Sequence, residues 1–167
     1  MNAGILFAVV AILVSASATA QTIIGEFGEW TAYRLGNSDG KTCLAASQPI
    51  DSKYSQTISG RDPAFFVVRT IPDKDIRNEP SAIAGYPFAD GFEVRVEVDE
   101  TSTFTMFTHD DTAWFEESDE EAALVAALQK GDRLVVTGKS RRGTTTTDLY
   151  SLAGVTAALK TVTKECP

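Results

Sequence analysis

Residues 133–152 read RLVVTGKSRRGTTTTDLYSL, and this stretch decides the fold class. Two runs of strand length, 133–139 and 144–152, are rich in valine, threonine, leucine and tyrosine. Between them lies the polar tetrapeptide Ser140-Arg141-Arg142-Gly143, whose glycine suits a tight turn. The pattern therefore predicts a β-hairpin.

Strand signals also dominate the sequence before this hairpin. Over residues 92–98, Phe92 and three valines alternate with charged residues, which is typical of a strand with one buried face. Further strands are predicted at 29–35, 41–47, 64–71 and 102–108, with a turn at residues 38–40 between the first two. Trp30 and Trp114 are the large aromatic residues that we expect to anchor the core.

Two helices are predicted to interrupt the strands. Residues 118–130 begin with Ser118 and Glu121, the spacing of a capping box, and carry an apolar stripe at 124, 125 and 128. The second helix is predicted at about 153–164, with apolar residues at 155, 158, 159 and 162 on one face. At least seven short strands and two helices predict a mainly β protein, a β-sandwich with two short helices.

The first 20 residues contain no charged side chain. An apolar run over 5–14 is followed by Ala18-Thr19-Ala20, which is the pattern of a secretory signal peptide cleaved after Ala20. The alternative is a retained N-terminal anchor, although the run is shorter than the roughly 20 apolar residues of a membrane helix. We predict a cleaved signal peptide over 1–20, a single domain over 21–167, and no stable membrane span after cleavage.

The net charge of −8 is unevenly distributed. Residues 89–121 hold 12 of the 23 acidic side chains, whereas residues 130–164 carry seven basic and two acidic ones. An acidic chain of this kind is a poor match for nucleic acid, so we expect no nucleic-acid partner. The asymmetry indicates either ordinary surface solvation or a partner-binding patch.

Cys43 and Cys166 are the only cysteines. In an oxidising compartment, two cysteines most simply form one intramolecular disulfide. The alternatives are a reactive thiol or a metal site, but there is no C-x-x-C pair and only one histidine to complete a zinc site. We predict a disulfide that fastens the C-terminus to the strand at 41–47.

No group of residues has the pattern of a catalytic or metal site. His109 lies in a polar segment that a turn explains better than nucleophilic catalysis, and no serine has a G-x-S-x-G context. Asp110-Asp111 lacks the spacing of an EF-hand calcium loop. Paired carboxylates for glycoside hydrolysis are not visible in a sequence. Arg141-Arg142-Gly143 is interpreted either as an anion-binding hairpin tip or as a solvated turn. We predict no catalytic residue, no cofactor and no metal.

Several motifs in order along the chain resemble the invasion-associated locus B family. The hairpin-to-helix segment 134–162 is the most specific of them. The others are FGEW at 27–30, CLAASQ at 43–48, RNE at 77–79, AGYPF at 84–88, FTMFT at 104–108 and DTAW at 111–114.

The resemblance implies an exported protein of Gram-negative bacteria, periplasmic or secreted, with an immunoglobulin-like β-sandwich. It also supports the pairing of Cys166 with Cys43. It transfers no catalytic residues. An interaction surface is predicted at the hairpin, formed by Arg141, Arg142, Thr146, Asp148 and Tyr150.

The function predicted from the sequence is surface recognition by a non-enzymatic exported protein. The partner would be an unknown protein or a cell surface, in host-cell interaction or invasion. The alternatives are a general periplasmic binding or envelope-maintenance protein and a carboxylate-dependent hydrolase.

Overall fold

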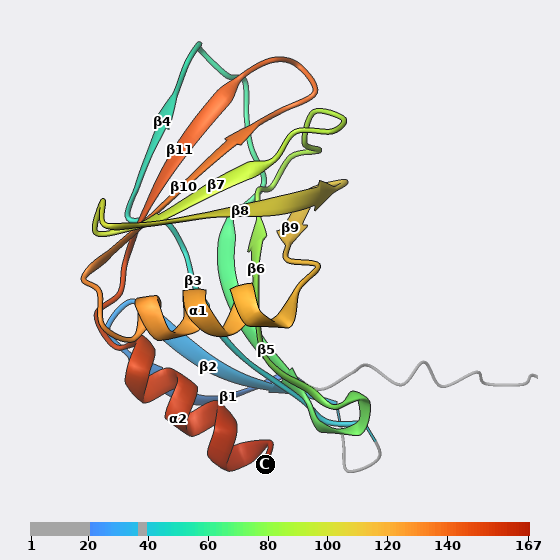
Figure 1. Ribbon diagram of the computed structural model, residues 1–167, viewed down its shortest axis with the longest axis vertical. Coiled ribbons are helices and arrows are strands. Elements are labelled where there is room, and N and C mark those ends of the chain that lie inside the picture. The colour runs from blue at the N-terminus through green and yellow to red at the C-terminus, as the bar shows by residue number, and fades with distance from the viewer. Residues whose placement is uncertain (1–20, 37–39) are drawn as a thin grey trace, which may run out of the picture.

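The structure is a computed structural model that describes residues 21–36 and 40–167 (Figure 1). The predicted signal peptide, with its cleavage after Ala20, lies outside the described residues. So does most of the turn predicted at 38–40.

Within the described residues, eleven strands form one open antiparallel sheet in the order β1-β2-β3-β5-β6-β9-β8-β7-β10-β11-β4. The strands are β1 (Gln21–Phe27), β2 (Trp30–Leu35), β3 (Thr42–Ser47), β4 (Asp51–Tyr54), β5 (Phe65–Ile71), β6 (Ile76–Ile83), β7 (Val94–Val98), β8 (Ser102–His109), β9 (Thr112–Trp114), β10 (Arg133–Lys139) and β11 (Thr145–Ser151). A 3-10 turn, η1 (Pro72–Lys74), joins β5 to β6.

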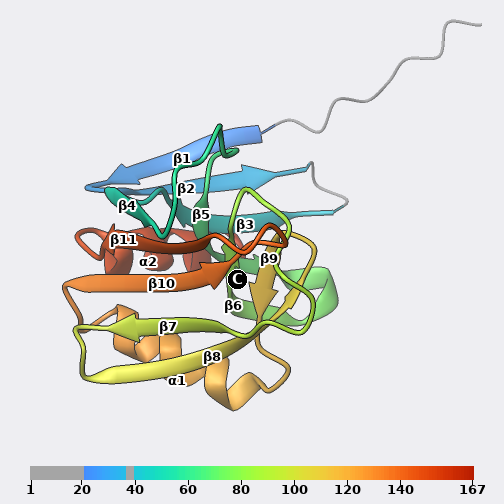
Figure 2. The same ribbon diagram turned by 90° about the horizontal axis from the view of Figure 1, so that it is seen from above.

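Strand β8 connects the two halves of the sheet because it pairs with different neighbours along its length. Residues 102–106 pair with β7, and residues 107–109 pair with β9. The prediction of a mainly β fold with two helices is confirmed. The strands, however, form one continuously paired sheet, and an immunoglobulin-like pair of separate sheets is not shown. In the view from above, β1 and β2 lie on one side of the molecule and β7 and β8 on the other (Figure 2).

The two halves are joined by edge-to-face aromatic contacts. Phe66 of β5 lies between Trp30 of β2, at a centroid distance of 6.5 Å, and Tyr150 of β11, at 6.1 Å. Trp30 is fully buried and its Nε1 donates to the Ser151 carbonyl at 2.9 Å, so its predicted place in the core is confirmed. Trp114 is only half-buried and stands outside the core, where Phe115 takes the buried position instead.

The helices pack mainly on the half of the sheet that contains β1, β2, β3, β5 and β6. Helix α1 (Ser118–Leu128) contacts β6 and β8, and α2 (Val155–Glu165) contacts β1, β2, β3 and β5. The predicted buried faces are confirmed. The predicted capping box is wrong, because Ser118 is already the first helical residue; Glu117 is the N-cap and makes no side-chain cap hydrogen bond.

The predicted hairpin is confirmed, and the structure gives its register. Residues 133–139 of β10 pair with residues 151–145 of β11. Four strands were not predicted from the sequence: β1, β4, β6 and β9. Strand β6 (IRNEPSAI) contains Pro80 and polar residues, and β4 and β9 are only four and three residues long. No helix in the described ranges is long and apolar enough to cross a membrane.

Candidate functional site

Four loops meet at one end of the sheet and surround an open pocket of about 1000 Å³. They are the connections β4–β5, β6–β7, β8–β9 and β10–β11, which lie toward the top and right of Figure 1. The pocket is lined by Tyr54 and residues 56–62, 85–87, 110–111, 140–142, 144 and 146. Binding residues are often found on loops that a rigid scaffold positions, so this pocket is the candidate site.

The floor of the pocket is built on a buried ion pair. Arg61, from the β4–β5 loop, donates from Nη1 and Nη2 to the two carboxylate oxygens of Asp148 on β11, each at 2.7 Å. The side chains of Arg61 and Asp148 are 8% and 4% exposed. Arg61 Nε also donates to the Ala84 carbonyl at 2.5 Å, and Ser52 donates to Asp148 at 2.6 Å. This bidentate geometry binds the loop firmly to the sheet.

The pair keeps Arg61 charged despite its burial. Burial lowers the pKa of the guanidinium, but the hydrogen bonds and negative charge of Asp148 more than offset this, so the pKa of Arg61 is raised. Tyr86 lies beneath the guanidinium, at 5.0 Å from its ring centroid, and its hydroxyl is 2.5 Å from Thr146 Oγ1. Burial raises the pKa of Tyr86, and the Thr146 hydrogen bond and the charge of Arg61 offset this only in part. Both residues therefore hold their ordinary neutral-pH charge states.

Backbone hydrogen bonds connect the four loops to one another. Asp62 N donates to the Gly85 carbonyl, Arg141 N to the Pro87 carbonyl, and Phe88 N to the Asp110 carbonyl. Because every loop is bonded to a neighbouring loop or strand, the pocket is preorganised.

Gly85 shows how closely two of these loops approach each other. Its φ is +72°, and a Cβ at this position would overlap the carbonyl oxygen of Asp62. Only glycine fits such a backbone without strain.

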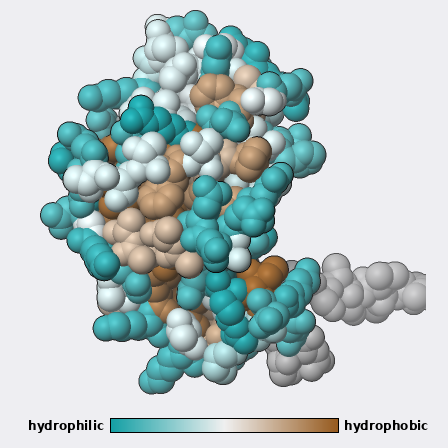
Figure 3. All heavy atoms as spheres, viewed as in Figure 1, coloured by the Kyte–Doolittle hydropathy of each residue, from teal (hydrophilic) through white to brown (hydrophobic). Residues whose placement is uncertain are grey.

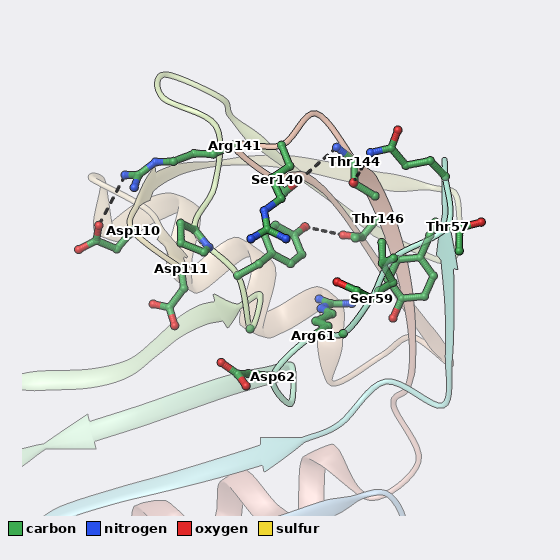
Figure 4. Close-up of a pocket in the computed structure, with 18 residues that line it drawn as sticks. Thr57, Ser59, Arg61, Asp62, Asp110, Asp111, Ser140, Arg141, Thr144 and Thr146 are labelled. Carbon is green, nitrogen blue, oxygen red and sulfur yellow. Dashed lines mark hydrogen bonds and ion pairs between the residues drawn. The ribbon is translucent and has the colours of Figure 1, made fainter.

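The mouth of the pocket is where the hairpin tip lies (Figure 4). Arg141 Nε is 3.3 Å from Asp90 and its Nη2 is 3.8 Å from Asp110, whereas Arg142 is exposed. Thr57 and Ser59 stand on the opposite side of the pocket from Asp110 and Asp111.

The predicted interaction surface is only partly at the surface. Arg141 and Arg142 are exposed at the pocket mouth, but Thr146, Asp148 and Tyr150 are 2%, 3% and 1% exposed. These three point inward because alternate residues of β11 face the interior, so they do not form an exposed surface with the arginines. They hold Tyr86, Arg61 and Phe66 instead. Burial, together with the charge of Asp148, raises the pKa of Tyr150.

The turn predicted at the polar segment around His109 is present but short: Asp110 and Asp111 form it, and His109 is the last residue of β8, paired with Thr112 of β9. His109 is 78% exposed, and its Nε2 lies 3.5 Å from an Asp110 oxygen. Asp110 has a positive φ of 50° at the tip of the turn. Among the described residues, no group of three or more His, Cys, Asp or Glu side chains is arranged to hold a metal ion.

The predicted disulfide between Cys43 and Cys166 is present, with a Cα–Cα distance of 6.0 Å and both residues buried. Glu165 strengthens the attachment, since it lies 2.9 Å from Arg34 and 3.2 Å from Lys41. The hydrogen bonds from Lys41 and Arg34 lower the pKa of Glu165. The C-terminus is thus fastened at the end of the sheet remote from the pocket.

Arg61, Tyr86 and the other pocket residues of the β4–β5 loop were not predicted as site residues from the sequence. A usable signal was present at the start of β11 and just before it, where Thr144, Thr146 and Asp148 are buried at positions that a sealed core would fill with apolar residues. Polar residues at such positions need partners, which here come from loops about 60 and 87 residues away in sequence.

Comparison with known families gives one match. The family model described as Invasion associated locus B (IalB) protein matches residues 30–163, which include all four loops of the pocket. No curated protein and no solved structure matches the chain.

Proposed function

The chain belongs to the Invasion associated locus B (IalB) family, and we propose that it is an exported, non-enzymatic protein that recognises its partner through the four-loop pocket. This recognition would serve host-cell interaction or invasion. The proposal places recognition in the pocket and its mouth rather than along the whole hairpin.

One observation carries the proposal: the buried charged residues of the pocket bind each other and thereby fix the shape of the pocket. Arg61 and Asp148 form a bidentate ion pair, and the Tyr86 hydroxyl is hydrogen-bonded to Thr146. Groups engaged in this way hold the loops in place and are not free to transfer protons or attack a substrate. A pocket whose shape is fixed in this way is suited to binding.

Export is supported by two features. Residues 1–20 have the sequence pattern of a signal peptide, and the buried Cys43–Cys166 disulfide is of the kind that persists in an oxidising compartment. We therefore place the protein in the periplasm or outside the cell. N-terminal sequencing of the exported protein should begin at Gln21, and an intact Met1 would contradict signal cleavage.

A second candidate function is favoured by the size of the pocket. About 1000 Å³ is at the upper end of the range for small-molecule sites, so a general periplasmic binding or envelope-maintenance protein would use the same cavity. This candidate differs from the first in its partner, which would be found in envelope extracts and not on host cells.

The test is a pull-down from envelope extracts and, separately, from host-surface extracts. Arg142→Ala and Tyr54→Ala alter the pocket mouth and should each reduce partner recovery by roughly tenfold, as expected for a contact of about 1.4 kcal/mol. Lys74→Ala removes a cation from the η1 turn outside the pocket, and Phe107→Ala removes a comparably exposed aromatic ring outside it. Undiminished recovery with both pocket variants, or equal loss with the controls, would overturn the proposal.

A further inference from the structure

We propose that the ligand of the four-loop pocket is an uncharged oligosaccharide a few sugar rings long. This inference rests on the proposed function, because it names the class of molecule that the same loops recognise.

The charges around the pocket argue against an ionic ligand. Positive and negative side chains line it in equal number: Arg61, Arg141 and Arg142, and Asp62, Asp110 and Asp111. Arg61 is neutralised by Asp148, and Arg141 lies between Asp90 and Asp110. Arg141 therefore does not act as a free anion site. A ligand with a large charge of either sign would meet repulsion as well as attraction from this mixed set of side chains.

The remaining polar groups suit hydroxyls. Gln56, Thr57 and Ser59 of the β4–β5 loop line the pocket, as do the carboxylates Asp62 and Asp111. Two of these groups also hold the pocket together, since Gln56 Nε2 donates to Thr144 and Asp111 accepts from Thr112. A sugar hydroxyl both donates and accepts, so it can pair with hydroxyl, amide and carboxylate groups in turn. In the space-filling view, the upper part of the molecule, where the loops lie, is a mixture of hydrophilic and intermediate residues with small hydrophobic patches (Figure 3).

An extended peptide is a poorer match to the same pocket. Peptides that add to a sheet are held by free backbone groups of the receptor. Several backbone N–H groups around the pocket are already bonded: Asp62 N to Gly85, Arg141 N to Pro87, and Ser140 N to Thr144. These three donors are not available to a peptide.

Apolar surface for the C–H faces of sugar rings is also present. Tyr54 is 38% exposed at the edge of the pocket, and Ile58 and Pro87 line it as well. An aromatic face attracts the slightly positive hydrogens of a ring stacked on it. A volume of about 1000 Å³ accommodates more than one ring, which favours a short chain over a monosaccharide.

The test is titration calorimetry of the exported protein with cellotetraose, tetra-N-acetylchitotetraose, maltotetraose and mannotetraose as uncharged probes. Tetragalacturonate is the charged comparison, and an acetylated Thr-Val hexapeptide is the peptide comparison. We expect at least one uncharged tetrasaccharide to bind more tightly than either comparison. Because the ligand is neutral, its affinity should change less than about twofold between roughly 50 and 500 mM salt.

Two variants identify the site. Tyr54→Ala should weaken binding about tenfold through the lost stacking surface, whereas Phe107→Ala, which removes a ring of similar exposure outside the pocket, should leave the affinity within about twofold. Binding of none of the four uncharged probes, or tighter binding of tetragalacturonate or the peptide, would overturn the inference. The pull-down separates this inference from the proposed function. If a partner is still captured from glycosidase-treated extracts, and the pocket variants still reduce that capture, only the oligosaccharide inference fails. If the pocket variants reduce capture from no extract, treated or untreated, the proposed function fails.

Discussion

Replacing Arg61 by methionine tests whether the Arg61–Asp148 pair anchors the pocket. Methionine keeps most of the apolar stem but removes two hydrogen bonds to Asp148 and one to the Ala84 carbonyl. Asp148 then keeps only its bond from Ser52 and is left as a charge that is 4% exposed. Removing one partner from a buried pair costs about 3–5 kcal/mol. For a domain of about 150 residues this corresponds to a fall in Tm of roughly 6–20 °C.

The assay is guanidinium unfolding under non-reducing conditions, followed by the tryptophan fluorescence of the buried Trp30 and the half-buried Trp114. The companion variant Asp148→Leu should cost less than Arg61→Met, because Arg61 lines the pocket and can still reach water there. The double variant should be more stable than the sum of the single losses predicts, since replacing both charges removes the unpaired one. Arg69→Met is the control, as its pair with Glu79 is 45% exposed on the arginine side and should contribute about 0–1 kcal/mol.

Two outcomes would refute the reasoning. If Arg61→Met loses less than about 1 kcal/mol, the bidentate pair does not anchor the loop. If the two single losses add fully in the double variant, Arg61 and Asp148 act independently of each other.

Three more predictions concern the rest of the fold. Removing the Cys43–Cys166 disulfide, which spans a sequence separation of 123, should destabilise the protein by about 5 kcal/mol on the chain-entropy relation, measured as a shift in guanidinium unfolding of the double alanine variant. The pKa of Glu165 is lowered in the folded state, so its contribution to folding stability is present above the ordinary pKa of 4.5 and is lost as the pH falls through the lowered value. Glu165→Gln should therefore reduce the dependence of the unfolding free energy on pH in this acidic range. An unchanged pH profile would contradict this. Gly85→Ala should lower the free energy of unfolding by more than about 1 kcal/mol, since a Cβ would overlap the Asp62 carbonyl oxygen. It should also weaken partner capture in the pull-down, because the loop would be displaced. A variant as stable as the wild type in guanidinium unfolding would contradict this close approach of the two loops.

The parts of the fold that follow from local sequence patterns were predictable. The β10–β11 hairpin follows from two β-rich runs around a turn, and the buried face of α2 follows from its apolar spacing. The single sheet could not be predicted, because it depends on β8 dividing its pairing between β7 and β9. Strand β6 was missed because Pro80 and its polar residues oppose the usual strand signal, and only pairing with β5 and β9 makes it a strand.

The candidate site was likewise predictable only in part, and β11 shows the reason. Its inward residues pass from polar to apolar surroundings along one strand: Thr146 bonds Tyr86, Asp148 binds Arg61, and Tyr150 packs on Phe66. The alternation was visible in the sequence, but the partners of these residues were not, because they lie in other loops and strands. The strand therefore changes from core to pocket at Asp148. Since Asp148 holds Arg61 and with it the β4–β5 loop, we expect the stability of the fold and the shape of the binding pocket to be coupled at this one residue.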